Sequence, residues 1–306
     1  MKRDRFKTML RVLRVNQWIK NLVIFTAIIF SGKLFDFALL LNSLYAFVVF
    51  CLLSSASYVL NDIIDYHFDR KHPLKRLRPI ASGEVTIAEA TFLVFLLTLV
   101  SLVTSMLFSV TFFVLAFVFI LLHFLYSLYL KKHAVVDIFT ISFSFMIRTF
   151  AGEVVSGYHI PIWLLLTIFF VSLFMATVKR HAELVATGSE TRASLHHYRT
   201  HLLDFLTTTF ATATIIAFSF YTYFEKPAQN QSIFYDSISR HFPTFEARKW
   251  MMISIPLVVY GISRYAQLLY EREEGERPEQ LITNDTPLLI TIILWGLIVI
   301  GLIYIF

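Results

Sequence analysis

Cysteine is almost absent from this sequence. Only Cys51 occurs among 306 residues, and it lies inside an apolar run. A disulfide framework and a cysteine-based zinc site are therefore excluded. The ten histidines show no metal-ligand spacing, and no GxxxxGK[ST] loop, GxSxG turn or HExxH helix occurs. These absences disfavour P-loop nucleotide binding, serine hydrolysis and zinc-peptidase chemistry.

Charged residues are also scarce. They make up 16% of the chain, whereas 57% of its residues are hydrophobic and 16% aromatic. A soluble domain carries about 25% charged residues, so this balance predicts an integral membrane protein. The basic start, MKRDRFKTMLRVLRVNQWIKN, is not followed by a small-residue cleavage pattern, which predicts a retained cytoplasmic end. No repeat, low-complexity tract or linker occurs, so we expect a single polytopic membrane domain over 1–306.

Long apolar runs are what the sequence has in abundance. Each approaches the ~20 residues that a helix needs to cross a bilayer core of ~30 Å. Lipid offers the backbone no hydrogen-bond partner, and the runs are too long for barrel strands, so the sequence predicts an all-α bundle of nine transmembrane helices. The predicted spans are 19–35, 37–60, 86–106, 109–130, 135–155, 161–180, 204–224, 250–270 and 287–306.

The distribution of Lys and Arg fits a cytoplasmic N-terminus and an external C-terminus. The predicted inner segments hold 21 of the 27 cationic residues, the outer segments hold five, and Arg148 lies within the fifth run. Cytoplasmic loops are enriched in Lys and Arg, so this asymmetry supports the span count. We expect cytoplasmic loops at 66–84, 131–134 and 181–203, and an outer loop at 225–249.

An unusual concentration of charge follows the second predicted span. The segment YVLNDIIDYHFDRKHPLKRLRPIASG, 58–83, holds three aspartates and then five cations. At 100° per residue, Asp62, Asp65 and Asp69 fall on one helix face, with Tyr58 and Asn61 beside them. Carboxylates this close raise one another's pKa unless a cation intervenes, so a divalent metal is one explanation. A solvated helix end paired with the arginines that follow is the alternative.

Other predicted cytoplasmic helix ends carry matching polar groups. Snorkelling to the membrane surface explains a Lys132 or an Arg272 taken singly, but not Arg148, which lies midway along its run and needs an anion partner. Arginine suits phosphate, and Mg²⁺ takes carboxylate, amide and phosphate oxygens. The pattern therefore predicts a magnesium-bound diphosphate with further phosphate held by cations. The remaining polar groups are Tyr126, Lys131, Lys179, Arg180, Glu183 and Arg264.

Two of these motifs resemble those of a known family. NDIIDYHFD, 61–69, matches the NDxxDxxxD motif of the UbiA prenyltransferase superfamily, and RPIASG, 78–83, resembles the RPxxSG that follows it there. Further segments are similar to its decaprenyl-phosphate phosphoribosyltransferase branch. They are QWIKN, YSLYLKKHAVVDI, IRTFAG, SLFMATVKRHAEL, SRYA and GERPEQLITND. The resemblance implies nine helices with a cytoplasmic active site in the bacterial plasma membrane.

The resemblance also implies a reaction. A polyprenyl phosphate attacks C1 of 5-phosphoribosyl 1-diphosphate and releases diphosphate, and the product feeds lipid-linked pentose donors (arabinose or ribose) for cell-envelope glycans. On this hypothesis Asp62, Asp65 and Asp69 are catalytic, and Mg²⁺ is bound by Asn61 and Asp65, assisted by Asp62 or Asp69. Substrate phosphate, diphosphate and ribose oxygens are contacted by Lys20, Tyr58, Lys75, Arg78, Tyr126, Lys131, Arg148, Lys179, Arg180, Glu183 and Arg264.

Two alternatives stay open from the sequence. An aromatic prenyltransferase of quinone biosynthesis would share the fold, but it carries a second Asp-rich motif where this chain has KRHAEL. A polyprenyl-phosphate carrier without chemistry would need cations for the lipid phosphate but no aspartate cluster. The aspartates and the absent second motif together favour the phosphoribosyltransferase.

Overall fold

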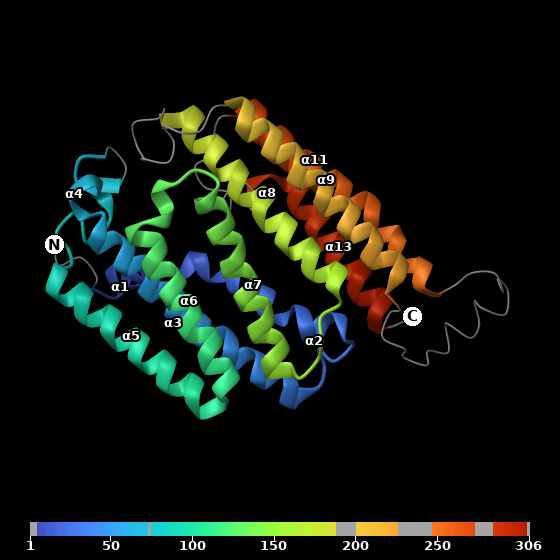
Figure 1. Cartoon of the computed structure of the whole chain (residues 1–306), viewed down its shortest axis with the longest axis horizontal. Helices are drawn as coiled ribbons and strands as arrows, with labels where there is room; N and C mark the ends of the chain where they lie inside the picture. The colour runs from blue at the N-terminus through green and yellow to red at the C-terminus, as the bar shows by residue number, and fades with distance from the viewer. Residues whose placement is uncertain (1–4, 73–74, 188–199, 226–246, 273–283, 305–306) are drawn as a thin grey trace. The chain divides into compact units, whose positions relative to one another are not determined.

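The computed structural model describes residues 5–72, 75–187, 200–225, 247–272 and 284–304, and every regular element in these ranges is a helix (Figure 1). This confirms the predicted all-α class. The helices group into two compact units. The first unit holds residues 1–26, 37–131 and 147–157, and the second holds 27–36, 132–146 and 158–306. Whether they act as one polytopic domain, as expected from the sequence, stays a prediction.

The first unit is built around one long helix, α3. It surrounds α3 with two short N-terminal helices and a hairpin of α5 and α6, which lie side by side in Figure 1. The second half of α7 completes this unit. The elements are α1 (Arg5–Leu13), η1 (Val15–Phe25), α3 (Phe37–Ile64), α4 (Tyr66–Asp69), η2 (Lys75–Leu77), α5 (Ile87–Phe108), α6 (Val110–Leu128), η3 (Leu130–Lys132) and α7 (Val136–Ser156).

Side-chain caps set where the α5–α6 hairpin starts and turns. Thr86 and Glu89 form a capping box at the start of α5, and Ser109 accepts a hydrogen bond from the Phe112 N–H at the start of α6. Such caps satisfy N–H groups that lack partners in the first turn. Phe112, Ala116 and Phe119 of α6 then pack on Phe50 and Leu53 of α3.

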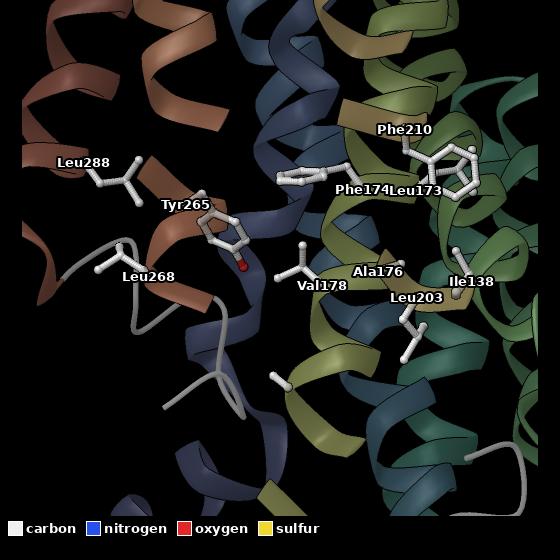
Figure 2. Close-up of a cluster of buried hydrophobic side chains, with 11 residues drawn as sticks. Ile138, Leu173, Phe174, Ala176, Val178, Leu203, Phe210, Tyr265, Leu268 and Leu288 are labelled. Atoms are coloured by element: carbon white, nitrogen blue, oxygen red, sulfur yellow. The ribbon is translucent and has the colours of Figure 1, made fainter. Parts of the chain in front are cut away.

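The second unit packs its helices around a core drawn from five of them. Its elements are α2 (Thr26–Phe30), the first half of α7, α8 (Ile162–Thr187), α9 (Thr200–Phe224), η6 (Ala247–Ser254), α11 (Ile255–Arg272) and α13 (Thr286–Tyr304). Figure 2 shows the core: Ile138 of α7, Phe174 of α8, Leu203 of α9, Tyr265 of α11 and Leu288 of α13 belong to it. The Phe174 and Tyr265 rings meet edge to face, 5.8 Å apart.

The segment 27–36 is tied to the far end of the chain by Tyr304. The Tyr304 hydroxyl accepts a hydrogen bond from the Leu34 N–H at 2.9 Å. It also lies 3.1 and 2.9 Å from the carbonyl oxygens of Ile28 and Ile29. The last turn of α13 thereby satisfies backbone groups of the turn that follows α2.

Seven helices of the described residues are long and apolar enough to cross a membrane, so the protein is a multi-pass membrane protein. They are α3, α5, α6, α7, α8, α9 and α13. An eighth is added if α1 and Val15–Phe30, which meet at a 45° bend, count as one span. The first predicted span, 19–35, differs most from the structure, since α2 covers only Thr26–Phe30 and a 3-10 helix precedes it.

Candidate active site

The aspartate-rich segment lies where α3 ends. The helix stops at Ile64, and Asp65 stands between α3 and the one-turn helix α4. The backbone N–H of Asp65 still bonds to the Asn61 carbonyl at 2.9 Å, and that of Asp69 bonds to the Asp65 carbonyl at 2.9 Å. Helical i to i−4 bonds therefore continue through the break at Asp65. By their partners, the polar side chains of the predicted stripe form two groups.

The first group is Asn61, Asp65 and Lys131. The Asn61 amide nitrogen donates to Asp65 Oδ2 at 2.9 Å. Lys131, which follows α6 in η3, donates from Nζ to Asp65 Oδ1 at 2.6 Å and to Asn61 Oδ1 at 3.2 Å. One ammonium thus bridges an amide oxygen and a carboxylate oxygen one helical turn apart.

The second group is Asp62, Asp69 and Arg78. Arg78 Nη1 lies 3.0 Å from Asp62 Oδ1 and 2.6 Å from Asp69 Oδ2, and both carboxylates are buried. Asp62 also receives a hydrogen bond from Arg14 Nη2 at 2.5 Å. Burial raises the pKa of the Asp69 carboxyl above its ordinary value, although the neighbouring Arg78 opposes the shift. Burial thus disfavours the ionised form of Asp69, and the contact with Arg78 offsets part of this effect.

A tight turn holds Arg78 in this position. The N–H groups of Ser82 and Val85 bond back to the carbonyls of Arg78 and Pro79, at 2.8 and 3.0 Å. Gly83 adopts φ +81°, a conformation that glycine tolerates best. Ile80 and Val85 pack with Val12, Val59 and Ala90 in a small buried core. The RPIASG segment is thus anchored on the C-terminal side of its arginine.

Within the described ranges, no three carboxylate, imidazole or thiol groups converge on one point. The oxygens instead converge in two pairs, and each pair already surrounds a cationic nitrogen. Lys131 Nζ and Arg78 Nη1 therefore each place a positive charge between two oxygens, as a bound cation would. Hard oxygen donors of this kind suit Mg²⁺, so the residues fit the metal that the sequence predicts.

The residues predicted at the N-terminal side lie beside α3. Lys20 Nζ donates to Gln17 Oε1 at 2.5 Å, and the Tyr58 hydroxyl donates to the same oxygen at 3.4 Å. The guanidinium of Arg14 lies 5.2 Å from the centre of the Tyr58 ring. Arg14 and Gln17 were missed from sequence. The signal for Arg14 was available, because it is one of several cations before the first apolar run.

Arg148 is buried in the first unit. Its Nε donates to Asn21 Oδ1 at 2.6 Å, and its Nη2 lies 3.4 Å from Ser54 Oγ. Its guanidinium lies 4.6 Å from the centre of the Phe119 ring. These contacts are to an amide, a hydroxyl and an aromatic face, and the phosphate contact expected of Arg148 stays a prediction.

Predicted site residues of the second unit pair with acids of that unit. Arg180 Nε donates to Asp137 Oδ2 at 2.6 Å, and its Nη1 donates to Glu183 Oε2 at 2.5 Å. Arg264 holds Asp285 with two bonds, of 3.2 and 2.8 Å. Asp137 and Asp285 were not singled out from sequence, although Asp137 lies within the KKHAVVDI segment. Lys75, Tyr126 and Lys179 are each partly buried.

The structure does not describe every predicted segment. Most of the 181–203 loop, the 225–249 loop and the GERPEQLITND segment lie outside the described residues. The expectations for these segments stay predictions.

More than half of the chain matches one protein family model. The UbiA prenyltransferase family model matches residues 22–234. The chain belongs to the UbiA prenyltransferase family. The match includes both 61–69 and 78–83, so it confirms the resemblance inferred from those motifs.

Individual relatives of this UbiA-family chain extend the likeness along almost its whole length. It is 35% identical over 294 residues to the decaprenyl-phosphate phosphoribosyltransferase of Mycolicibacterium smegmatis, covering 94% of this chain and 89% of that protein. It is 32% identical over 304 residues to the enzyme of the same name from Corynebacterium glutamicum, covering 97% and 87%.

A solved structure shares the fold. The structure of a UbiA homolog from Archaeoglobus fulgidus bound to GPP and Mg²⁺ matches with a TM-score of 0.71. The two chains are 18% identical, and the match covers 97% of this UbiA-family chain and 99% of the other.

Proposed function

We propose that this protein transfers 5-phosphoribose from 5-phosphoribosyl 1-diphosphate to a polyprenyl phosphate of the decaprenyl type and releases diphosphate. The product would serve as a precursor of lipid-linked pentose donors, arabinose or ribose, for cell-envelope glycans. The observation that carries the proposal is the similarity to two curated decaprenyl-phosphate phosphoribosyltransferases, which spans 94% and 97% of the chain. The aspartate and cation pairs at the end of α3 supply the chemistry that this reaction needs.

We propose nine spans in a bacterial plasma membrane, with the N-terminus and the site on the cytoplasmic side. The distribution of Lys and Arg supports this orientation. A water-soluble, multiply charged sugar donor would then reach the site from the cytoplasm, and the lipid acceptor would reach it from the bilayer.

Mg²⁺ is the proposed cofactor. Asn61 and Asp65 would hold one ion, and Lys131 would turn from them to substrate oxygens. Asp62 and Asp69 would assist in binding that ion or would hold a second one. When bound, the metal supplies Lewis acidity, which stabilises the negative charge that develops on the diphosphate. The convergence of two oxygen pairs on cationic nitrogens supports this assignment.

The chain's own cations would hold the substrates through the reaction. Lys20, Lys75 and Arg78, with Tyr58, would contact diphosphate and ribose oxygens, and Lys131 with Tyr126 would contact phosphate. An acceptor phosphate oxygen forms a bond to C1 as the bond from C1 to the diphosphate oxygen breaks, and diphosphate leaves with that electron pair. The acceptor oxygen is already anionic, so no general base is required. Fixed cations stabilise the charge that moves.

Lys179, Arg180, Glu183 and Arg264 complete the proposed substrate-binding set. Arg180 and Arg264 each have a carboxylate partner in the second unit. A cation neutralised in this way contacts phosphate only through the hydrogen-bond donors that its partner leaves exposed. We propose that Lys179 also contacts substrate phosphate.

Purified protein with Mg²⁺, the sugar donor and a polyprenyl phosphate should form a lipid-linked phosphoribose, detected by mass spectrometry, together with diphosphate. Asp65→Asn should lower kcat/KM by about 100-fold or more, since it removes a charge that holds the metal. Glu89→Gln is the matched control, because it makes the same chemical change at an exposed capping box that tolerates Gln.

Three outcomes would contradict the proposal. Near-normal turnover of Asp65→Asn would reject the metal assignment. Prenylation of an aromatic acid from a prenyl diphosphate, without phosphoribose transfer, would favour the quinone alternative. Lipid binding without diphosphate release would favour a carrier.

A further inference from the structure

The N-terminal segment of the first unit is held in an unusual conformation. After Arg14, which has φ +50°, residues Val15–Phe25 form an 11-residue 3-10 helix. Runs of 3-10 helix longer than three or four residues are uncommon, and positive φ is unfavourable for residues other than glycine. Contacts outside the segment must therefore hold it in place.

The 3-10 helix sorts its side chains into three rows, because residues three apart lie above one another. Asn16, Ile19 and Leu22 form an exposed row. Trp18, Asn21 and Ile24 form the row that turns inward, with Asn21 and Ile24 fully buried. Gln17, Lys20 and Val23 form a partly buried row. The predicted substrate contact, Lys20, thus belongs to a row whose direction depends on how the inward row is fixed.

Asn21 is the polar centre of the inward row. Its amide nitrogen donates to Cys51 Sγ at 3.2 Å. Its oxygen accepts from Ser54 Oγ at 3.3 Å and from Arg148 Nε at 2.6 Å. The Asn21 side chain therefore joins η1 to α3 and to α7 at one buried point.

Helix α7 makes a second contact with the same row one turn further on. A Cβ atom added to Gly152 would lie 2.0 Å from the carbonyl oxygen of Ile24. Only glycine allows this approach of backbone to backbone. Residues 148 and 152 lie on one face of α7, as do Asn21 and Ile24 on η1. The two elements are therefore fixed at two points, Arg148 to Asn21 and Gly152 to Ile24.

The contacts of the inward row also set the direction of the partly buried row, and this second row carries the groups beside Tyr58. Lys20 and Tyr58 both donate to Gln17 Oε1, and Tyr58 lies one turn before Asp62 on α3. A rotation of η1 about its axis would carry Gln17 and Lys20 away from Tyr58. The position of Lys20 thus depends on Asn21, Arg148 and Gly152.

We propose that Asn21, Arg148 and Gly152 form a positioning clamp, which fixes the 3-10 helix so that Lys20 meets the sugar diphosphate. This rests on the proposed function. It gives Arg148 a different role from the phosphate contact expected from the sequence, since its guanidinium contacts Asn21, Ser54 and the Phe119 face. Asn21, Arg148 and Gly152 act through Lys20 and are not catalytic residues.

A mutant cycle tests the dependence on Lys20. Asn21→Ala should raise KM for 5-phosphoribosyl 1-diphosphate about tenfold with little change in kcat, because a positioned cation contributes to binding before and during reaction. In a Lys20→Ala background, Asn21→Ala should add little, since its effect passes through the missing side chain. Asn21→Asp keeps the oxygen acceptor and should restore a KM near that of the wild type. Independent, multiplying effects would overturn the proposal.

Arg148 and Gly152 have their own discriminating variants. Arg148→Lys keeps the positive charge but loses the Nε donor, so the clamp predicts the same rise in KM, whereas a direct phosphate contact would be largely kept. A near-normal KM would reject the clamp. Gly152→Ala should act like Asn21→Ala. Gly296→Ala is the matched control, because a Cβ there meets nothing within 4 Å.

A measurement without turnover separates the clamp from the proposed function. Single cysteines at positions 16 to 20 and 22, probed with a thiol reagent in detergent, should label fastest at 16, 19 and 22. The native Cys51 is buried and serves as the background. Adding Asn21→Ala should remove the period of three. If labelling is unchanged by Asn21→Ala, the clamp fails whatever the enzyme transfers; if the period is lost but no phosphoribose is transferred, the clamp stands and the proposed function fails.

Discussion

Arg180 shows how much one buried charge depends on its partners. Its side chain is 1% exposed, and that of Asp137 is fully buried, so neither charge is solvated by water. Glu183, which is 24% exposed, supplies a second carboxylate. Removing one partner of a buried pair leaves the other charge without compensation, which is far more costly than removing both.

Asp137→Asn should therefore destabilise the protein by about 3–5 kcal/mol, since Arg180 keeps its charge in the same surroundings. Thermal unfolding in detergent, followed by size-exclusion chromatography after heating, measures the loss. Glu183→Gln should cost less, because that carboxylate is partly solvated, and Asp137→Leu combined with Arg180→Met should recover part of the stability. Unchanged unfolding of Asp137→Asn would contradict the importance of this pair.

At the level of single residues, the sequence identified most of the polar groups but few of the partnerships. Asn61, Asp65 and Lys131 were all expected, and they do contact one another. Arg14, Asp137 and Asp285 were not, because the choice of ion-pair partner depends on which helices pack together. Sequence spacing predicts which residues lie close together on one helix, but not which residues meet across two packed helices.

Among the elements, the turn between η2 and α5 has a clear backbone requirement. Gly83 has φ +81° and no atom within 4 Å of where a Cβ would stand, so a substitution there meets strain but no collision. Gly83→Ala should cost about 1–2 kcal/mol, the left-handed penalty of an L-residue. Arg78 lies in the same turn, so donor binding should weaken as well.

Thermal unfolding and the donor KM measure these two effects of Gly83→Ala. Gly301→Ala serves as the control, because its surroundings are also open and no left-handed φ occurs there. Equal behaviour of the two variants would show that the turn does not depend on glycine.

The first predicted span illustrates why element type is harder to predict than apolar content. Residues 19–35 are apolar enough for a helix, but the 3-10 conformation of Val15–Phe25 was not foreseen. Over 11 residues, periods of 3.0 and 3.6 diverge by less than one turn, so hydrophobic spacing does not separate them. The conformation of this segment is decided by its contacts with Gly152 and Arg148. Arg148 lies 127 residues after its partner Asn21 in the sequence.

At the scale of the whole molecule, the number of spans fixes the side on which the chain ends. Nine spans with a cytoplasmic N-terminus place residue 306 outside. Among the described residues, seven helices are long and apolar enough to cross a membrane, or eight if the bent pair is one span. Helix α11 is not one of them. The side of the membrane on which residue 306 lies therefore depends on whether 250–270 crosses the bilayer.

Fusion reporters answer it directly. A C-terminal alkaline phosphatase should be active and a C-terminal green fluorescent protein dark, because the first matures only outside the cytoplasm and the second only inside. A fusion after residue 187 should show the reverse, which controls for expression. Fluorescence of the C-terminal fusion would mean an even number of spans and would require a new assignment of either 19–35 or 250–270.

The bond between Tyr304 and the turn after α2 bears on how the protein is made. The backbone groups of Ile28, Ile29 and Leu34 are inserted early, yet their partner is translated about 270 residues later. Until then this turn lacks the hydroxyl that satisfies it, and long-range contacts of this kind form slowly. The turn after α2 therefore reaches its final structure only after Tyr304 has been synthesised, and until then its backbone groups are without their native partner.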